Sequence, residues 1–260
     1  MFLKLMERLG RNVMNFIREF GQIVFLIYNV VRYFPRFVKD RKLIIEQMKI
    51  IGSDSLPLVL LIGAFTGAIA ALEATLLFSK FNLINITRPY LGASIATAVF
   101  TELTPVLTAL VIAGRVGGAI AAQIGTMKVS EQIDALEMMA IDKNRFLAMP
   151  RILAALLMMP VLAVFSNFVA LLGAYLLVSL KFEFTTFEYF NSIQSYFATN
   201  EVLISLSKSM IFGGVTALVG CHVGFATFGG AEGVGNSTVR AFTISASAIL
   251  VIDALFGYIF

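Results

Sequence analysis

The chain is poor in the residues that disulfide-bonded, metal-binding and soluble proteins use. Its 260 residues include one cysteine, one histidine and no tryptophan, and only 14% of them are charged. A single cysteine excludes an intrachain disulfide, and Cys221 beside His222 makes a poor metal site, so we expect no bound metal. A soluble domain carries about 25% charged residues. The composition therefore argues against a soluble protein.

The chain also lacks a recognisable catalytic constellation. It has no GxxxxGKS or GxxxxGKT segment, so we expect no catalytic residue, no cofactor and no nucleotide site of its own. The glycines of residues 229–235 lack a strand–loop–helix context, and a tight turn between helices explains them better. The net charge is +4, but ten of the 20 lysines and arginines lie in the first 49 residues. Anionic lipid headgroups explain that cluster better than nucleic acid does.

Long apolar stretches fill most of the sequence. Hydrophobic residues make up 58% of the chain, and the mean hydropathy is +0.88. A helix needs roughly 20 apolar residues to cross a membrane. Stretches of this length lie at about residues 55–78, 91–114, 152–180, 203–226 and 241–260. We therefore predict an all-α polytopic membrane protein with about five transmembrane helices.

Residues 1–52 contain no clean span. Apolar residues from Phe16 to Phe34 recur on one helical face, while Arg18 and Arg32 lie on the other. Such an amphipathic helix lies in the membrane interface rather than across the membrane. We therefore assign residues 1–52 to interfacial and cytoplasmic helices and residues 53–260 to a transmembrane domain. A cleaved signal peptide is the alternative, but Arg18 and Glu19 interrupt the apolar run.

The distribution of lysine and arginine predicts the orientation. Besides the ten in the N-terminal region, five lie in the segment 115–151, two follow the first span, and one follows the third. The positive-inside rule places the N-terminus and the segment 115–151 in the cytoplasm. Five spans then leave the C-terminus outside, and we expect residues 181–201 to form an outside loop.

Four ionisable side chains interrupt the apolar spans: Glu73, Glu102, Lys208 and Asp253. Facing lipid, such a group costs roughly 2.5–3.5 kcal/mol. An interhelical pair such as Glu102 with Lys208 is one solution, and the lining of a cavity for an amphiphile's headgroup is another. Asp253 could instead lie near the outer membrane edge. Pro105 has no N–H, so it should free the carbonyl of Thr101 and kink the second span.

Two further patterns predict helix contacts. Gly63 and Gly67 form a GxxxG motif, which serves either packing within one subunit or a dimer seam. Residues 131–142 predict a helix of about three turns between spans two and three. Ile133, Leu136 and Met139 share one of its faces. Such a helix suits docking into a groove of another protein, and packing on its own membrane domain is the alternative.

Two segments carry a resemblance to a known family. These are ELTPVLTALVIAGRVGGAIAAQIGTMKVSEQIDALEMMAID at residues 102–142 and GCHVGFATFGGAEGVGNSTVRAF at residues 220–242. From about Leu43 to Phe260 the chain resembles the MlaE/YrbE family, the permease subunits of ABC-type lipid transporters. The resemblance implies a homodimeric permease in the inner membrane of a bacterium with two membranes, with its C-terminus in the periplasm. Its cargo would be phospholipid, moved between the inner and outer membranes.

The resemblance also implies partners. A partner ATPase (MlaF-like) would bind ATP and Mg²⁺ and dock on a coupling helix at residues 131–142. A periplasmic MCE-domain protein (MlaD-like) and, in many systems, a small STAS-domain protein (MlaB-like) would complete the complex. The lipid cavity would lie between two subunits, lined by the first span and the start of the second. An ion- or proton-coupled secondary transporter with an acidic relay is the alternative, but the sequence shows no inverted repeat of broken helices.

Residue roles follow from the same resemblance. The candidate lipid-cavity residues are Leu72, Glu73, Leu76, Thr101, Glu102 and Lys208. The candidate ATPase-coupling residues are Glu131, Gln132, Asp134, Leu136, Glu137, Met138, Met139 and Asp142. The sequence departs from the family pattern at Thr104, where glycine is usual, at Lys143, where proline is common, and at Glu73, where glutamine is common.

Overall fold

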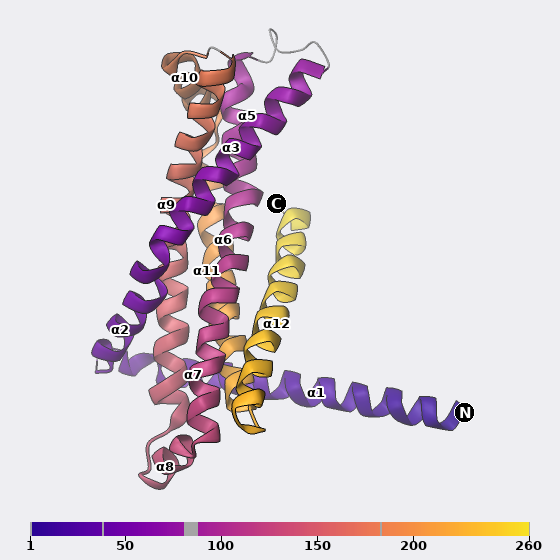
Figure 1. Cartoon of the computed structure of the whole chain (residues 1–260). Helices are drawn as coiled ribbons and strands as arrows, with labels where there is room; N and C mark the ends of the chain where they lie inside the picture. Colours follow the sequence, from indigo (N-terminus) through magenta and orange to yellow (C-terminus); the bar gives the residue numbers. More distant parts are fainter. Residues whose placement is uncertain (1, 38, 81–87, 183, 260) are drawn as a thin grey trace.

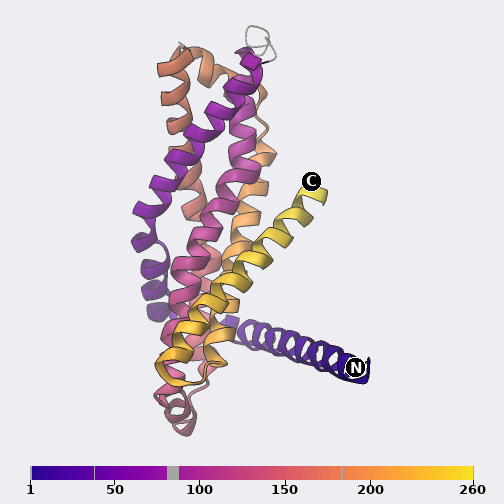
Figure 2. The same ribbon diagram turned by 45° about the vertical axis from the view of Figure 1, so that its right-hand side comes forward.

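The computed structural model describes residues 2–37, 39–80, 88–182 and 184–259 (Figure 1). Within these ranges the regular structure is helical, and five helical segments are long and apolar enough to cross a membrane. They are Arg41–Lys80, Arg88–Val129, Asn144–Phe182, Thr199–Phe225 and Gly230–Ile259. The predicted all-α polytopic fold is confirmed. The segments run along a common bundle, with α8 (Gln132–Met138) at one end and α10 (Thr186–Tyr196) at the other (Figures 1 and 2).

The N-terminal helix α1 (Phe2–Tyr33) projects sideways from the bundle, nearer to the α8 end (Figures 1 and 2). Its C-terminal part is packed, because Leu26 and Val30 are buried in the main core. The next residues of the predicted apolar stripe, Ile27 and Val31, are exposed. The side chains of Phe16 and Phe20, also in that stripe, lie outside the described part. An exposed apolar face on a projecting helix fits an interfacial position in a membrane.

The first span joins α2 (Arg41–Ile51) to α3 (Leu56–Lys80) through the short turn η2 (Ser53–Ser55). α3 packs along the long helix α9 (Met149–Phe182). A Cβ atom added to Gly67 would lie 1.8 Å from the carbonyl oxygen of Ala170, and one on Gly63 would lie 2.7 Å from that of Ser166. The GxxxG motif therefore serves packing within the chain, where glycine lets two helix backbones come together.

The second span is one continuous rod with two π-helical turns. It starts with η3 (Arg88–Tyr90) and α5 (Leu91–Ala98), and a first π-helical turn, η4 (Val99–Leu103), precedes α6 (Thr104–Ile112). A second π-helical turn, η5 (Ala113–Gly117), leads into α7 (Gly118–Val129). π-helical turns interrupt the regular hydrogen-bond ladder and are frequent at functional sites. These two turns contain Glu102 and Arg115.

The expectation of a loop at residues 181–201 is wrong, because helix α10 lies within it. Thr185 and Glu188 form a capping box at its start, in which each side chain accepts a hydrogen bond from the other residue's backbone N–H. The backbone N–H of Ala93 in α5 donates to Ser192 Oγ over 3.1 Å and fixes α10 on the bundle. The helix is too short to span a membrane, so a search for long apolar runs passes over it.

The last two helices are α11 (Thr199–Phe225) and α12 (Gly230–Ile259). The turn between them uses Gly229 and Gly230, which have φ angles of +91° and +67° that favour glycine. This confirms the predicted interhelical turn. α12 buries only Ala241, Ser245 and Ile249, and it leans away from the bundle so that the C-terminus lies part-way along it (Figures 1 and 2).

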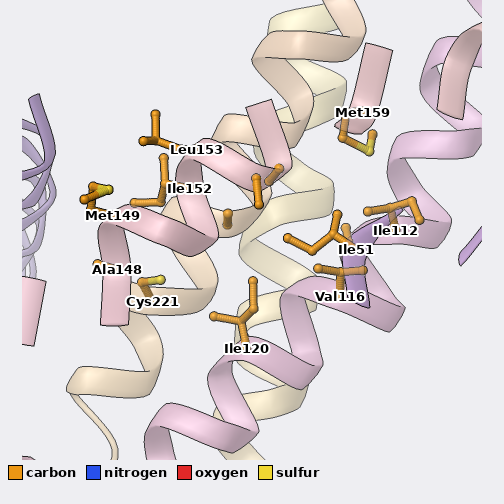
Figure 3. Close-up of a cluster of buried hydrophobic side chains, with 14 of the residues drawn as sticks. Ile51, Ile112, Val116, Ile120, Ala148, Met149, Ile152, Leu153, Met159 and Cys221 are labelled. Carbon is orange, nitrogen blue, oxygen red and sulfur yellow. The ribbon is translucent and has the colours of Figure 1, made fainter. Parts of the chain in front are cut away.

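The main core lies toward the α8 end and unites several spans (Figure 3). Ile51 of α2, Ile112 of α6, Ile120 of α7 and Met159 of α9 are all nearly inaccessible to solvent. Helix η6 (Asn144–Ala148) and Cys221 of α11 complete this cluster. Because Ile44 and Ile51 are part of the core, α2 at the start of the first span is packed on the other spans.

Candidate functional site

A buried lysine lies at the centre of the charged groups in the bundle. Lys208 on α11 is 1% exposed, and its ammonium group contacts three oxygen atoms. The distances are 2.7 Å to Asp253 Oδ1 on α12, 3.2 Å to Glu102 Oε1 on η4 and 2.8 Å to the carbonyl oxygen of Thr101. The ammonium group donates hydrogen bonds to the Thr101 carbonyl and to Glu102, and its contact with Asp253 is an ion pair without hydrogen-bond geometry. The second, fourth and fifth spans are thus joined through one side chain.

Pro105 explains why the Thr101 carbonyl is available. In a regular helix this oxygen would accept a hydrogen bond from the backbone N–H of residue 105, and proline has none. The π-helical turn at Val99–Leu103 falls at the same place. The freed carbonyl instead accepts the hydrogen bond from Lys208 Nζ. The predicted release of the Thr101 carbonyl is therefore confirmed.

The two carboxylates around Lys208 differ in exposure. The side chain of Asp253 is 18% exposed, whereas that of Glu102 is 51% exposed. Glu102 can therefore contact a ligand while it keeps its ion pair. Asp253 is paired with Lys208, and its position relative to the membrane edge stays a prediction. The predicted Glu102–Lys208 pair is confirmed, and Asp253 is the partner that was not predicted for it.

The remaining candidate cavity residues lie on α3. Glu73 and Leu76 are exposed, and Leu72 is partly buried. Within the described residues Glu73 has no ion pair, unlike Glu102. The structure thus brings Thr101, Glu102 and Lys208 together, and it leaves Glu73 and Leu76 on the outer surface of the isolated chain. A role of these six residues in lipid binding stays a prediction.

A layer of buried polar side chains was missed by the sequence reading. Thr108 donates to Ser166 Oγ over 3.2 Å, and the Asn167 amide donates to Ser205 Oγ over the same distance. These contacts join α6, α9 and α11 in the interior. Single serine, threonine or asparagine residues inside apolar spans give only a weak signal, because each can also bond to its own helix backbone.

At the other end, the predicted helix of residues 131–142 is shorter than expected. α8 comprises seven residues, Gln132–Met138. Glu131 and Ala140 have φ angles of +59°, a left-handed conformation that ends the helix on each side. Asp142 lies beyond it, where it accepts hydrogen bonds from the Tyr33 hydroxyl and the Asn144 backbone N–H, each over 2.8 Å.

The predicted apolar face of α8 is only partly correct. Ile133 is 1% exposed and Leu136 packs against the core, so this face docks on the protein's own membrane domain. Met139 was expected on the same face, but it is 62% exposed, and Met138 is 84% exposed. Met138 is the last residue of α8, and Met139 follows it before the left-handed turn at Ala140. They form an apolar tip, which we call the methionine tip.

Ion pairs hold the segment around α8. Lys128 pairs with Asp134 and Lys143 with Glu137, each over 2.8 Å. Arg145 forms two hydrogen bonds to the Asp40 carboxylate, of 2.9 and 3.0 Å, and so ties the segment to the start of α2. Glu131 and Gln132 are exposed. Within the described ranges, no three His, Cys, Asp or Glu side chains are grouped to hold a metal ion.

Comparison with known proteins places this geometry in a family. The model of the family Permease MlaE matches residues 44–259. A probable ABC transporter permease protein of Rickettsia prowazekii is 34% identical over 264 residues, covering 100% of this chain and 99% of its own. One of Synechocystis is 37% identical over 212 residues, covering 82% of this chain and 79% of its own.

A third relative carries a more specific name. The intermembrane phospholipid transport system permease protein MlaE of Haemophilus influenzae is 29% identical over 255 residues, covering 97% of this chain and 96% of its own. The chain belongs to the MlaE family of ABC transporter permeases.

Proposed function

We propose that this permease moves phospholipid between the inner and outer membranes of a bacterium, driven by a partner ATPase. The observation that carries the proposal is the Lys208-centred cluster, which holds a half-exposed Glu102 among apolar spans. A carboxylate in that position can bind the polar headgroup of an amphiphile while the apolar helices contact its chains. The name of the Haemophilus influenzae relative supports phospholipid as the cargo.

The resemblance to the family supplies the partners, and we propose a surface for two of them. The ATPase docks at α8, where the methionine tip and the acidic residues Glu131 and Glu137 are accessible. This end faces the cytoplasm of an inner-membrane protein, because it carries the excess of lysine and arginine. A periplasmic MCE-domain protein then docks at the α10 end, and a STAS-domain protein binds elsewhere in the complex. ATP and Mg²⁺ bind to the ATPase and not to this chain.

A second copy of the chain completes the lipid cavity. Glu73, Leu76 and Glu102 are exposed on membrane-spanning segments of the isolated chain, where contact of a carboxylate with lipid is costly. A homodimer whose seam includes these surfaces encloses the carboxylates. The alternative of a proton relay through Glu73, Glu102 and Asp253 is weaker, because Lys208 pairs with two of the three.

The test is the lipid content of the purified complex. The complex of permease and ATPase is isolated with wild-type permease, with Glu102→Ala and with the control Glu232→Ala at an exposed position of α12, and extracted lipids are quantified by mass spectrometry. We expect Glu102→Ala to retain several-fold less phospholipid than the other two. Equal phospholipid in all three complexes would contradict the assignment of Glu102 to the cargo site.

A further inference from the structure

A mainly apolar pocket with three polar side chains lies between α2 and the η5–α7 part of the second span, and it shares no residue with the Lys208 cluster. It has a volume of about 230 Å³, and we call it the α2–α7 pocket. Gln47 and Ile50 of α2 form one wall, and Arg115 and Gln123 form the other. Both walls belong to membrane-spanning segments. Figure 1 shows α2, α7 and the base of α1 at a similar height in the bundle.

The polar groups of this pocket are cationic or neutral. The residues that line it include one arginine and two glutamines but no aspartate or glutamate. Glu46 and Asp54, the acids nearest to it in the sequence, are exposed and do not line it. A pocket with these groups favours an anion. The Lys208 cluster has the opposite balance of charge, because two carboxylates surround one cation there.

Arg115 has hydrogen-bonding capacity to spare. A guanidinium group carries five N–H donors. Within the described residues its hydrogen bond is to the hydroxyl of the buried Ser55, a neutral acceptor. The π-helical turn Ala113–Gly117 places Arg115 at the pocket, and its side chain is exposed there. The remaining donors are therefore available to an anion, for which a planar guanidinium gives a bidentate contact.

A second arginine fixes the orientation of Gln123. Arg151 of α9 is only 8% exposed, and its Nη2 donates to Gln123 Oε1 over 3.4 Å. Because the amide oxygen accepts this hydrogen bond, the amide NH₂ group is the donor that Gln123 offers to the pocket. The Nε atom of Arg151 is buried without a hydrogen-bond partner. Its charge adds positive potential behind the pocket wall.

We propose that the α2–α7 pocket binds the phosphodiester headgroup of a glycerophospholipid from the leaflet in which α1 lies. The phosphate contacts Arg115 and the Gln123 amide, and the acyl chains pass along Ile50 and the apolar outer surface of α3. A phosphodiester fits because it is an anion whose oxygens match a guanidinium fork. The proposal is independent of the cargo site at Glu102, because the two sites share no residue.

Photocrosslinking tests the proposal. The full-length chain is reconstituted in phosphatidylcholine vesicles with a trace of phosphatidylglycerol that carries a diazirine near its headgroup, and labelled peptides are mapped by mass spectrometry. The variants are Arg115→Gln, Gln123→Leu and the control Lys49→Gln. Lys49 is an exposed cation of α2 that does not line the pocket. Circular dichroism and thermal unfolding check that each variant is folded.

We expect labelling of the peptides that contain residues 43–51 and 115–125 in the wild type and in Lys49→Gln. Arg115→Gln should reduce it roughly ten-fold, the effect of losing one charge-assisted hydrogen bond. If Arg115→Gln does not fold, Gln123→Leu decides, with a smaller loss expected. Labelling that is equal in the wild type and the folded variants would overturn the proposal. Excess glycerol phosphate should leave labelling unchanged, and competition by it would replace the lipid with a soluble phosphate ligand.

Discussion

At the scale of single residues, Lys208 carries the greatest structural weight. It pairs with both Glu102 and Asp253, and it also donates to the carbonyl that Pro105 frees. A buried charge network of this kind contributes little net stability when intact, but removing one partner leaves the others uncompensated. Its value to the permease is to hold three spans at one defined position around the half-exposed Glu102.

The first prediction concerns this ion pair. Lys208→Met should destabilise the purified chain by about 3–5 kcal/mol, because Asp253 is left buried without its cation. The measurement is chemical unfolding in detergent. The double variant Lys208→Met with Asp253→Asn should recover part of the loss, since it removes the uncompensated charge. Lys181→Met, at an exposed position, is the control. A single variant as stable as this control would contradict the role given to Lys208.

At the scale of elements, the methionine tip of α8 is the surface most suited to a partner. Ile133 and Leu136 are used in packing on the membrane domain, so the docking contact must come from the opposite side of the segment. We predict that Met138→Asp lowers association with the ATPase at least ten-fold, because a carboxylate would be desolvated in an apolar interface. Co-purification and permease-stimulated ATP hydrolysis measure this effect.

Control variants distinguish a direct contact with the ATPase from an effect on the conformation of the α8 segment. Phe187→Asp is a matched change at a 77% exposed residue of α10, at the other end of the bundle, and should leave ATPase binding unchanged. Glu137→Lys should also weaken binding, but it breaks the pair with Lys143 as well. The exchange of both charges, Glu137→Lys with Lys143→Glu, restores that pair. If the exchange restores full binding, the acidic group acts through the loop and not by contact with the ATPase.

The capping box of α10 predicts a local dependence on pH. The backbone N–H and hydroxyl of Thr185 donate to the Glu188 carboxylate and lower its pKa below the ordinary value of 4.5. A lowered pKa in the folded state means that the carboxylate stabilises the helix start above pH 4.5 and that this stabilisation is lost as the pH falls further. In hydrogen exchange, the protection factors of residues 186–190, which are corrected for the intrinsic pH dependence of exchange, should fall on acidification.

Glu188→Gln provides the comparison for this effect. The glutamine side chain can still accept hydrogen bonds from Thr185 but does not titrate in acid, so the loss of protection should be absent from this variant. The same pH profile in the wild type and in Glu188→Gln would show that another group controls the start of α10. Hydrogen exchange of α12 residues in the same sample shows whether the whole chain unfolds, and so distinguishes global unfolding from local opening of α10.

At the scale of the whole molecule, α12 is the least enclosed span. Exposed apolar residues along it include Val239, Leu250, Val251 and Leu255. If a second copy covers this helix, a cysteine at Val251 should form a disulfide between two copies in native membranes. The one native cysteine, Cys221, is fully buried, so it does not compete with the introduced cysteine for disulfide formation. Phe168→Cys on α9, at a similarly exposed position, is the control and should stay monomeric. Equal crosslinking of both variants would contradict a seam at α12.

Much of the architecture was predictable because it depends on additive, local properties. Hydropathy and span length predict the number of membrane crossings, because each apolar residue adds its own contribution to the free energy of transferring a helix into the membrane. The freed carbonyl of Thr101 follows from Pro105 alone, and the turn before α12 follows from Gly229 and Gly230. Helix α10 had a local signal too, the capping pattern at Thr185 and Glu188, which a search for spans does not detect.

The sequence by itself therefore determined the class of protein, its spans and the presence of charged groups that need partners. The tertiary structure decided which partners they have. Lys208 meets Asp253 as well as Glu102, Gly67 packs on Ala170 and not on another subunit, and Met139 lies outside while Ile133 is buried. Each of these outcomes depends on residues far apart in the chain. Only the packing of helices brings such groups within the few ångströms over which ion pairs, close backbone contact and burial act.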